Sequence, residues 1–380
     1  MPILVLNCGS SSAKYKLYDV KKDIFVAEGM IEKIGEKQSF LKHKSSDGKT
    51  ISTGIDAPDH HMAIKIIIET LMHDNHGVIK SKDEIKAIGH RVVHGGEEFS
   101  SSVLITDKVI NSIKKFSRLA PLHNPPALYG IEACIELLSG IPQVAVFDTA
   151  FHQTLPVEAY MYAIPYKYYT KYGLRRYGFH GTSHKYVAGK AARMLKKNLK
   201  DLKIITCHLG NGCSMTAVDK GNSIETSMGF TPLEGLIMGT RCGDMDPAVV
   251  PFLMEQENIT TKEVDNILNK KSGLLGVSGI GNDMRQLNEE IAKGNERAKL
   301  AIDMFFYRIK KYIGAYMGIM NGLDAIVFTA GIGENNPWLI ERVKKEMSEL
   351  ISKFKVEILV IPTKEEWMIA METNEIIKKS

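Results

Sequence analysis

The chain has 380 residues, of which 44% are hydrophobic and 24% charged, and its formal net charge is +5. A chain of this length is expected to hold two or three domains with a real core, and its composition is typical of a soluble globular protein. The positive charge is weak and dispersed, which suits anionic small molecules and argues against nucleic acid as a partner.

Cysteine usage and hydropathy indicate where the protein works. The five cysteines include no CxxC pair, so we expect neither a disulfide framework nor a zinc site, and we infer a reducing compartment. The first residues are apolar but lack a basic leader region and a cleavage site, which argues against a signal peptide. No run of eighteen apolar residues occurs, so we expect no membrane span. A cytoplasmic protein is therefore predicted.

Two segments share one pattern. Residues 4–19 read LVLNCGSSSAKYKLYD, residues 204–219 read IITCHLGNGCSMTAVD, and the two align without a gap. Each passes from an apolar run through small residues into a second extended run, which predicts a β-hairpin with exposed backbone N–H groups at its tip. Such a tip can cradle phosphate. Two copies predict two related halves that hold phosphate groups between them.

The predicted elements alternate between strands and helices in the manner of an α/β protein. The first part is expected to hold strands at 3–7, 14–20, 25–34, 38–44, 86–93 and Val144–Phe147, and helices at 60–73, 107–118 and 126–138. The second part is expected to hold strands from about Lys203 to 227, at Ala325–Phe328 and at Val356–Ile361, and helices at 246–256, 260–270, 283–293, 296–320 and 337–350. No low-complexity linker separates the parts, so the repeat places the boundary just after Asp148.

Four motifs in the first part carry candidate functional residues. The turn Asn7–Lys14 is either a plain polar hairpin or a phosphate site, and its second copy and Lys14 favour phosphate. Arg91, in the apolar strand pattern GHRVVHGG, is either half of a buried ion pair or a planar clamp on a carboxylate or phosphate. His123 lies in APLHNPP, a rigid non-helical loop that either positions a ligand or is a structural turn. Asp148 ends a buried strand, where α/β proteins place ligands, and a helix N-cap is the alternative.

The second part adds four more. His180 lies in YGFHGTSH, where neighbouring glycines and basic residues weigh against an ordinary core histidine. Arg241 occupies the glycine-flanked loop GTRCGDMDP. Asp283 and Arg285 begin a predicted helix and either face a ribose or base or form an ordinary acidic first turn. The segment TAGIGENN is predicted to be a glycine-rich turn before a helix N-terminus, a ready anion site.

Taken together, these motifs resemble the acetate kinase family. LNCGSSSAK and GHRVVHGG are similar to its two signatures, and the resemblance continues in order through APLHNPP, VFDTAFHQT, YGFHGTSH, HLGNG, MGTRCG, NDMR and GIGEN to IPTKEE. It covers nearly the whole chain. The family belongs to the acetate and sugar kinase, heat-shock ATPase and actin superfamily. The implied fold is α/β, with two duplicated ribonuclease H-like domains around a nucleotide cleft, over residues 1–148 plus 367–380 and 149–366.

The resemblance also implies roles for individual residues. Asp148, Arg91, His180 and Arg241 would be catalytic, and Asn7 and Glu365 would be on the magnesium side. The substrate site would comprise Arg91, Val93, Leu122, His123, Phe179 and Pro232, of which Val93, Leu122, Phe179 and Pro232 form an apolar pocket for a methyl group. The nucleotide site would comprise Ser10, Ser12, Lys14, His208, Leu209, Gly210, Asn211, Gly212, Asp283, Met284, Arg285, Gly331, Ile332, Gly333, Glu334 and Asn335.

The implied reaction is reversible phosphoryl transfer from ATP to acetate, with Mg²⁺, or Mn²⁺ in its place, as cofactor. Arginines and a histidine suit this chemistry because both substrates are anions, and charge spreads over the phosphoryl oxygens during transfer. Acetate needs no deprotonation near neutral pH, so Asp148 is expected to position Mg²⁺ rather than to act as a base. The family further implies a homodimer, through the second domain. A propionate or butyrate kinase and a nucleotide-switched binding protein remain as alternatives.

One stretch departs from the family pattern. Between Glu334 and Glu365 the chain is shorter than the resemblance leads us to expect. The missing piece would lie near the adenine, which leaves nucleotide preference and cleft closure open. Trp367 stands where a smaller aliphatic residue is expected.

Overall fold

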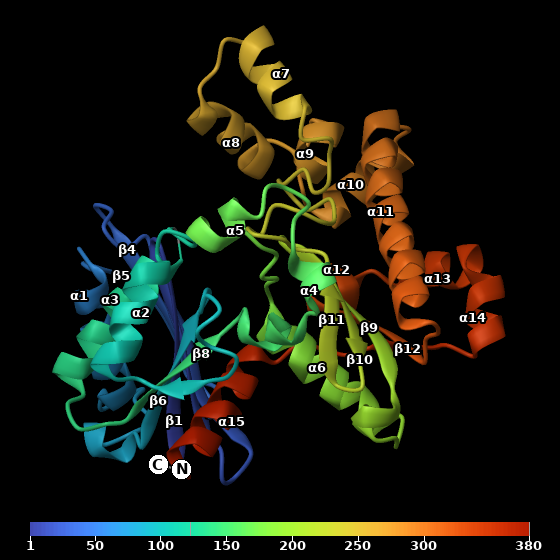
Figure 1. The fold of residues 1–380 in the computed structure, drawn as a ribbon. Coiled ribbons are helices and arrows are strands. Elements are labelled where there is room, and N and C mark those ends of the chain that lie inside the picture. Colours follow the sequence, from blue (N-terminus) through green and yellow to red (C-terminus); the bar gives the residue numbers. More distant parts are fainter. Residues whose placement is uncertain (122, 380) are drawn as a thin grey trace. The chain divides into compact units, whose positions relative to one another are not determined.

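The structure is a computed structural model that describes residues 1–121 and 123–379. It divides into two compact units (Figure 1). Unit 1 comprises Met1–Gln153 and Lys364–Ser380, and unit 2 comprises Thr154–Thr363. The second unit thus begins at residue 154 rather than 149, and the chain returns to the first at residue 364 rather than 367.

Unit 1 is built on one mixed sheet with strand order β5-β4-β3-β2-β1-β6-β8-β7. Strands β1 to β5 form an antiparallel meander, while β6 runs parallel to β1 and β8 parallel to β6. Its elements are β1 (Pro2–Gly9), β2 (Ser12–Asp19), β3 (Ile24–Glu32), β4 (Ser39–Ser45), β5 (Thr50–Ile55), α1 (His60–Met72), β6 (Ala87–Val92), β7 (Val103–Leu104), α2 (Asp107–Phe116), α3 (Asn124–Leu137), β8 (Gln143–Phe147) and α15 (Glu365–Ile377).

Unit 2 is built on a smaller mixed sheet with strand order β11-β10-β9-β12-β13. Its strands are β9 (Lys203–Leu209), β10 (Cys213–Asp219), β11 (Asn222–Thr226), β12 (Ala325–Thr329) and β13 (Glu357–Val360). Its helices are α4 (Val157–Tyr160), α5 (Lys167–Tyr172), α6 (Gly181–Met194), α7 (Val249–Gln256), α8 (Thr261–Lys270), α9 (Gly273–Ser278), α10 (Met284–Ala292), α11 (Glu296–Met320), α12 (Ala330–Asn335), α13 (Pro337–Glu346) and α14 (Ser348–Phe354).

The two sheets repeat one topology. In unit 1 the strands β3-β2-β1-β6-β8 form an antiparallel hairpin pair followed by two parallel strands, and β11-β10-β9-β12-β13 do the same in unit 2. The duplicated ribonuclease H-like fold expected from the sequence is therefore confirmed.

The two hairpins differ in register by one residue. Gly9 pairs with Ser12 in the first hairpin, which leaves a two-residue turn. Leu209 pairs with Cys213 in the second, which leaves the three residues Gly210–Gly212 in its turn. The gap-free sequence alignment therefore misplaces the first strand of one hairpin relative to the other.

Helices cover both faces of the unit 1 sheet, and one of them comes from the far end of the chain. Helix α3 packs on β1 and β6, and α15 packs on β1, β6 and β8. The approach of α15 is close, because a Cβ added at Gly89 would lie 2.4 Å from Oγ1 of Thr373 and 2.8 Å from Cγ2 of Ile369. Trp367 packs edge-on against the Tyr18 ring, with centroids 5.2 Å apart. The aromatic residue unexpected at position 367 thus fills a place in the unit 1 core.

Three local predictions were wrong. Helix α3 begins at Asn124, so Pro125 and Pro126 of APLHNPP lie in its first turn, where a missing N–H costs nothing. Helix α12 spans Ala330–Asn335, so all of GIGEN is helical rather than a turn before a helix. The helix predicted over 337–350 divides into α13 and α14. Among the described residues, no helix has the length and hydrophobicity that a membrane span requires.

Candidate functional site

The first hairpin brings Asn7 and Lys14 side by side. They are directly opposite each other on β1 and β2, and both line a cavity of about 510 Å³ on this sheet. The Lys14 side chain is exposed, as is Ser10 at the turn, while Ser12 is half-buried. His60, at the start of α1, supports the turn through a 2.7 Å contact between its Nε2 and the Gly9 carbonyl. The hairpin is therefore a braced element that presents a cation and backbone groups to solvent.

Arg91 connects this hairpin to Asp148. Its Nε lies 3.2 Å from Asp148 Oδ1, and its Nη2 lies 2.5 Å from Oδ2, so the pair is bidentate. The third nitrogen, Nη1, reaches Oδ1 of Asn7 at 3.4 Å. Burial alone would lower the pKa of Arg91, but the Asp148 and Glu365 carboxylates outweigh that effect and raise it. The structure shows the buried ion pair that the sequence left as one of two interpretations, and Arg91 keeps 21% of its side chain exposed.

Glu365 stands at the start of α15, in the same unit. It is half-buried. Burial raises the pKa of its carboxyl to about 7; Arg91 opposes this, and the neighbouring charge of Asp148 adds to it. A carboxyl with a raised pKa beside another carboxylate is a site that a cation would stabilise in its charged form.

The oxygen donors of unit 1 suit a magnesium ion. Asp148, Glu365 and Asn7 supply two carboxylates and one carboxamide around Arg91. Magnesium in kinases takes one or two carboxylates and completes its shell with waters and substrate phosphates. No cluster of three His, Cys, Asp or Glu suited to a metal occurs in the described chain. Asp148, Glu365 and Asn7 are the side chains of unit 1 that could hold such an ion.

Unit 2 contains a cluster of three histidines. His180 is the N-cap of α6 with a left-handed backbone (φ 55°), and its ring stacks on His208 with centroids 4.2 Å apart. Nδ1 of His180 contacts Ser214 Oγ at 2.8 Å, and Nε2 of His184 contacts the same oxygen at 2.7 Å. Nδ1 of His208 is 2.8 Å from Ser183 Oγ. His180 is thus held on two sides and remains half-buried.

Arg241 lies beside the second hairpin and near His180. A Cβ placed on Gly212 would be 3.3 Å from Arg241 Nη1 and 3.5 Å from Cε1 of His180. Nη1 donates to the carbonyl of Pro232 at 3.2 Å. Within the described residues no carboxylate forms an ion pair with Arg241. Its Nη1 also contacts the Met238 sulfur at 3.7 Å, and burial lowers its pKa. An arginine without a carboxylate partner, next to a small-residue turn, is ready to receive an anion.

Further loops gather at the second hairpin. Asn282 Nδ2 donates to Asn211 Oδ1 at 2.9 Å, and a Cβ on Gly210 would lie 3.8 Å from Cβ of Ala330. The turn Gly210–Gly212, the start of α10 and the start of α12 are therefore neighbours. These are the three segments that the resemblance assigns to the nucleotide, and that role stays a prediction.

Not every residue of those segments faces solvent. Asp283 caps α10 and pairs with the exposed Arg285 at 2.9 Å, whereas Met284 is 4% exposed and belongs to the core. Residues that lie inside the fold are Met284, His208, Leu209 and Gly333, while Gly331 and Asn335 are exposed and Ile332 is half-buried. Oε1 of Glu334 accepts from the N–H groups of Ala330 and Thr363, which makes it a structural brace.

The residues that the resemblance assigns to an apolar pocket belong to two different units. Val93 lies in unit 1 and is 8% exposed. Phe179 and Pro232 lie in unit 2, the first 3% exposed and the second half-buried. His123 is half-buried as the N-cap of α3. Leu122 lies outside the described residues.

Sequence reasoning missed the residues that hold the candidates in place. These are Ser214 and His184 around His180, His60 under the first turn, and Asn282 beside Asn211. Ser214 could have been found, because it occupies in the second hairpin the position of Lys14 in the gap-free alignment. The others carry no local signal, since their partners are distant in sequence.

The chain is similar to known proteins in sequence and in structure. The sequence profile of the Acetokinase family matches residues 2–352. The acetate kinase of Halothermothrix orenii is 55% identical over 397 aligned positions, which cover all of both chains. That alignment is longer than this chain, so the relative carries residues that this chain lacks. The profile match ends within α14, inside the stretch that the sequence marked as short.

Solved structures show the same similarity. The crystal structure of Porphyromonas gingivalis acetate kinase superposes with a TM-score of 0.95 at 47% identity, covering 99% of each chain. A propionate kinase from Francisella tularensis superposes with a TM-score of 0.91 at 42% identity, again over 99% of each chain.

Proposed function

Since the chain belongs to the acetokinase family, we propose that it is an acetate kinase, which transfers a phosphoryl group reversibly between ATP and acetate to give acetyl phosphate and ADP. The observation that carries the proposal is that each phosphate-binding hairpin has its own arginine. Arg91 contacts Asn7 of the first hairpin, and Arg241 lies against Gly212 of the second. A transfer between two anions needs two such cationic positions.

The residues of the site lower the repulsion between the substrates. Arg91 would hold the acetate carboxylate or the acyl phosphate through its planar guanidinium. Arg241 and a donor from His180 would stabilise the charge that spreads over the equatorial phosphoryl oxygens during in-line attack. One hydrogen bond with Ser214 and the stacking of the His208 ring hold His180 in place, so that its donor does not reorganise during the reaction.

Asn7, Glu365 and Asp148 would hold the magnesium ion. When bound, that ion supplies positive charge at the phosphate oxygens. Asp148 also fixes the guanidinium of Arg91 by its bidentate contact. We assign it no role as a base, because acetate is already ionised near neutral pH.

The nucleotide would be bound by Lys14 and the Ser10–Ser12 turn at its phosphates, and by the loops of unit 2 at its remaining groups. The turn Gly210–Gly212 suits phosphate, since its two glycines let a phosphate approach the backbone, and Asn211 at its tip is exposed. Asp283 and Arg285 are exposed at the start of α10, as a ribose or base contact requires.

A propionate kinase is the second candidate, and the likeness to the Francisella tularensis structure favours it. One methylene changes binding by only about 1–3 kcal/mol, so the fold does not decide between the two acids. A nucleotide-switched binding protein fits less well, because a switch has no use for a second anion site at Arg91.

Acyl phosphate formation, trapped as the hydroxamate, is the test. With ATP and Mg²⁺ we expect turnover with acetate that falls as the acid lengthens to propionate and butyrate. A preference for propionate or butyrate would keep the reaction and change the substrate. Absence of turnover with all three acids, in a folded protein that binds ATP, would contradict the proposal.

We also propose that the protein is a homodimer through unit 2. Leu300, Met304 and Tyr307 follow one face of α11, and their exposed fractions are 51%, 38% and 68%. Apolar side chains at this spacing form a continuous stripe that a partner would cover. Light scattering should give twice the chain mass of 42.3 kDa.

A further inference from the structure

Residues 227–244, between β11 and α7, form an irregular segment that is largely buried. We call it the Ser227–Asp244 segment. It carries Pro232 and Arg241, two of the residues assigned to the substrate and the transition state. A long irregular segment has many backbone polar groups that need partners when buried. What holds it therefore determines where Pro232 and Arg241 lie.

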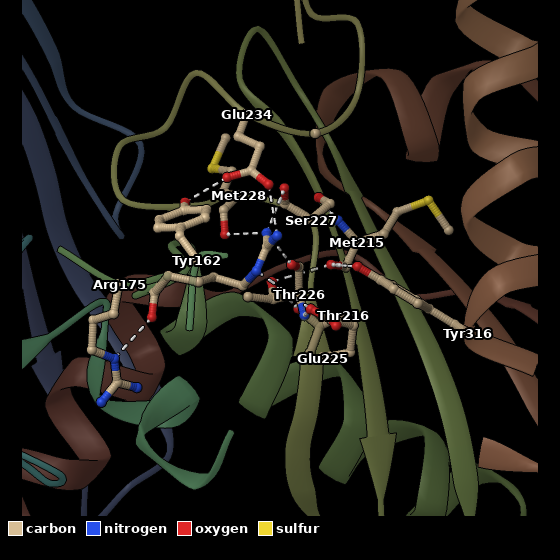
Figure 2. Close-up of polar contacts among 12 residues, drawn as sticks. Tyr162, Arg175, Met215, Thr216, Glu225, Thr226, Ser227, Met228, Glu234 and Tyr316 are labelled. Atoms are coloured by element: carbon tan, nitrogen blue, oxygen red, sulfur yellow. Dashed lines mark hydrogen bonds and ion pairs between the residues drawn. The ribbon is translucent and has the colours of Figure 1, made fainter. Parts of the chain in front are cut away.

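A single guanidinium supplies much of that support. Nη1 of Arg176 donates to the carbonyl oxygens of Thr226, Ser227 and Met228 at 2.9, 3.3 and 3.3 Å (Figure 2). Nη2 of the same group lies 2.6 Å from Oε1 of Glu234. Arg176 thus joins the point where the chain leaves β11 to a residue two positions after Pro232.

Tyr162 completes the arrangement from another loop. Its hydroxyl donates to Oε2 of Glu234 at 2.6 Å and accepts from the Phe230 N–H at 2.8 Å. The packing leaves no room at Gly229, where an added Cβ would come within 2.2 Å of the Tyr162 hydroxyl. Both oxygens of Glu234 are therefore occupied, one by Arg176 and one by Tyr162 (Figure 2). We call Arg176, Glu234 and Tyr162 the loop clamp.

The loop clamp is connected directly to the assigned site residues. Pro232 lies between Phe230 and Glu234, which the clamp holds, and its carbonyl accepts from Nη1 of Arg241 at 3.2 Å. The Gly229 carbonyl accepts from the N–H groups of Tyr177 and Gly178 at 3.1 and 3.3 Å. Those two residues immediately precede Phe179 and His180. One set of contacts thus fixes the apolar residues Phe179 and Pro232 together with Arg241.

The carboxylates around position 176 explain why this residue is an arginine. Besides Glu234, the carboxylate of Glu225 lies 3.6 Å from Nε of Arg176. Burial raises the pKa of Glu225, and the charge of Arg176 opposes that rise. Lysine could neutralise one carboxylate, but it lacks the planar fork that reaches three carbonyls and a carboxylate at once.

We propose that Arg176, acting with Glu234 and Tyr162, is a positioning residue that sets the acyl-chain specificity of the enzyme by fixing Pro232 and Arg241. The inference rests on the proposed function, since it names what determines the choice among short carboxylic acids. It assigns to the clamp no contact with either substrate.

The test is Arg176→Lys in the full-length protein, assayed by hydroxamate formation with acetate and propionate. We expect KM for acetate to rise roughly tenfold and the acetate-to-propionate ratio of kcat/KM to fall by about threefold or more, with KM for ATP changed less than about twofold. Tyr162→Phe removes one hydroxyl only. It should also lower the acetate-to-propionate ratio of kcat/KM. If the lysine variant does not fold, this second variant tests the proposal.

Arg342→Lys is the matched control. Arg342 binds the carboxylates of Asp303 and Glu346 and lies over the Phe306 ring, all outside the Ser227–Asp244 segment. It should leave the acid ratio unchanged. Hydrogen exchange of residues 227–244 gives a readout independent of turnover, and it should speed up in Arg176→Lys but not in Arg342→Lys.

Each outcome bears on one proposal. A folded Arg176→Lys protein with an unaltered acid ratio and unaltered exchange would overturn the inference, as would equal effects in Arg342→Lys. A wild-type protein inactive with every acid would instead overturn the proposed function. The exchange measurement would then still decide whether the clamp holds the segment.

Discussion

At the scale of single residues, the two arginines of the proposed site differ in whether a carboxylate neutralises them. Arg91 is neutralised by Asp148, whereas Arg241 is bonded to the Pro232 carbonyl and the Met238 sulfur. A carbonyl does not cancel the charge of a guanidinium. The charge of Arg241 is therefore less compensated than that of Arg91, which is shared with Asp148.

Replacing Asp148 by asparagine tests its assignment. We expect kcat to fall on the order of 10²-fold, with part of the rate recovered at high Mg²⁺, because asparagine keeps an oxygen donor but loses the charge that holds a cation. Steady-state rates across a Mg²⁺ titration measure this, with thermal unfolding recorded to separate lost stability. A Mg²⁺ dependence equal to that of the wild type would contradict the metal-positioning role.

His90 predicts how stability depends on pH. It is 2% exposed on β6 and contacts Gln143 at 2.7 Å, and burial lowers its pKa to about 4. The unfolded chain takes up a proton near pH 6.5, while the folded chain does not until about pH 4. The free energy of unfolding should therefore fall as pH drops through this window, by up to about 3 kcal/mol from this residue.

Urea unfolding of the wild type and of His90→Gln at pH 7 and pH 5 measures that contribution. Glutamine can keep a hydrogen bond to Gln143 but does not titrate. The variant should lose less stability than the wild type between the two pH values. Equal losses would mean that His90 is protonated in the folded protein.

At the scale of elements, close packing between a helix and the sheet positions the strand ends that carry the proposed site. Helix α15 carries Glu365 at its first residue and Ile369 and Thr373 against Gly89 of β6. Arg91 follows Gly89 by two positions on the same strand. The spacing between α15 and β6 thus sets how Glu365 and Arg91 lie relative to each other.

Gly89→Ala should disturb this packing. A Cβ would overlap Thr373 and Ile369, and we expect a loss of about 1–3 kcal/mol in the free energy of unfolding. Gly189→Ala is the matched control, since nothing lies within 4 Å of its Cβ in the middle of α6. That change should be neutral or stabilise by up to about 1 kcal/mol. Equal effects of the two substitutions on urea unfolding would show that α15 does not pack as described.

At the scale of the whole molecule, the chain leaves unit 1 at Gln153 and returns to it at Lys364. The returning helix completes a core cluster in which Ile369 and Ala370 join residues of β1, β6 and β8. Unit 1 is therefore incomplete until the last residues of the chain have been made. Unit 2 is continuous in sequence and has no such requirement.

A chain that ends at Thr363 lacks α15 and should therefore affect unit 1 but not unit 2. We expect the amides of β1, β6 and β8 to lose protection in hydrogen exchange, because one face of their sheet is uncovered, while β9, β10 and β12 stay protected. A chain that lacks only the residues after Ile377 serves as the control. Unchanged protection in unit 1 would show that α15 is dispensable for its fold.

The sequence alone determined the parts that depend on local patterns. The repeated hairpin, the helix at 296–320 and the strand before Asp148 follow from periodicity, and the structure has them at Glu296–Met320 and Gln143–Phe147. Residues such as Arg91, Asp148, His180 and Arg241 were found because a charge or histidine among apolar or glycine residues is unusual wherever the chain folds. Motifs of this kind predict a chemistry before any contact is known.

Only the tertiary structure decided which partner each of these groups has. The one-residue difference between the hairpin registers, the helical start at Asn124 and the pairing of Arg91 with Asp148 depend on competing contacts that no short window contains. The loop clamp is the clearest example, because Tyr162, Arg176 and Glu234 are in contact although they are up to 72 positions apart in the sequence. The sequence shows which residue types are present and how far apart they lie along the chain. Burial and distance in the fold decide which partner each side chain contacts.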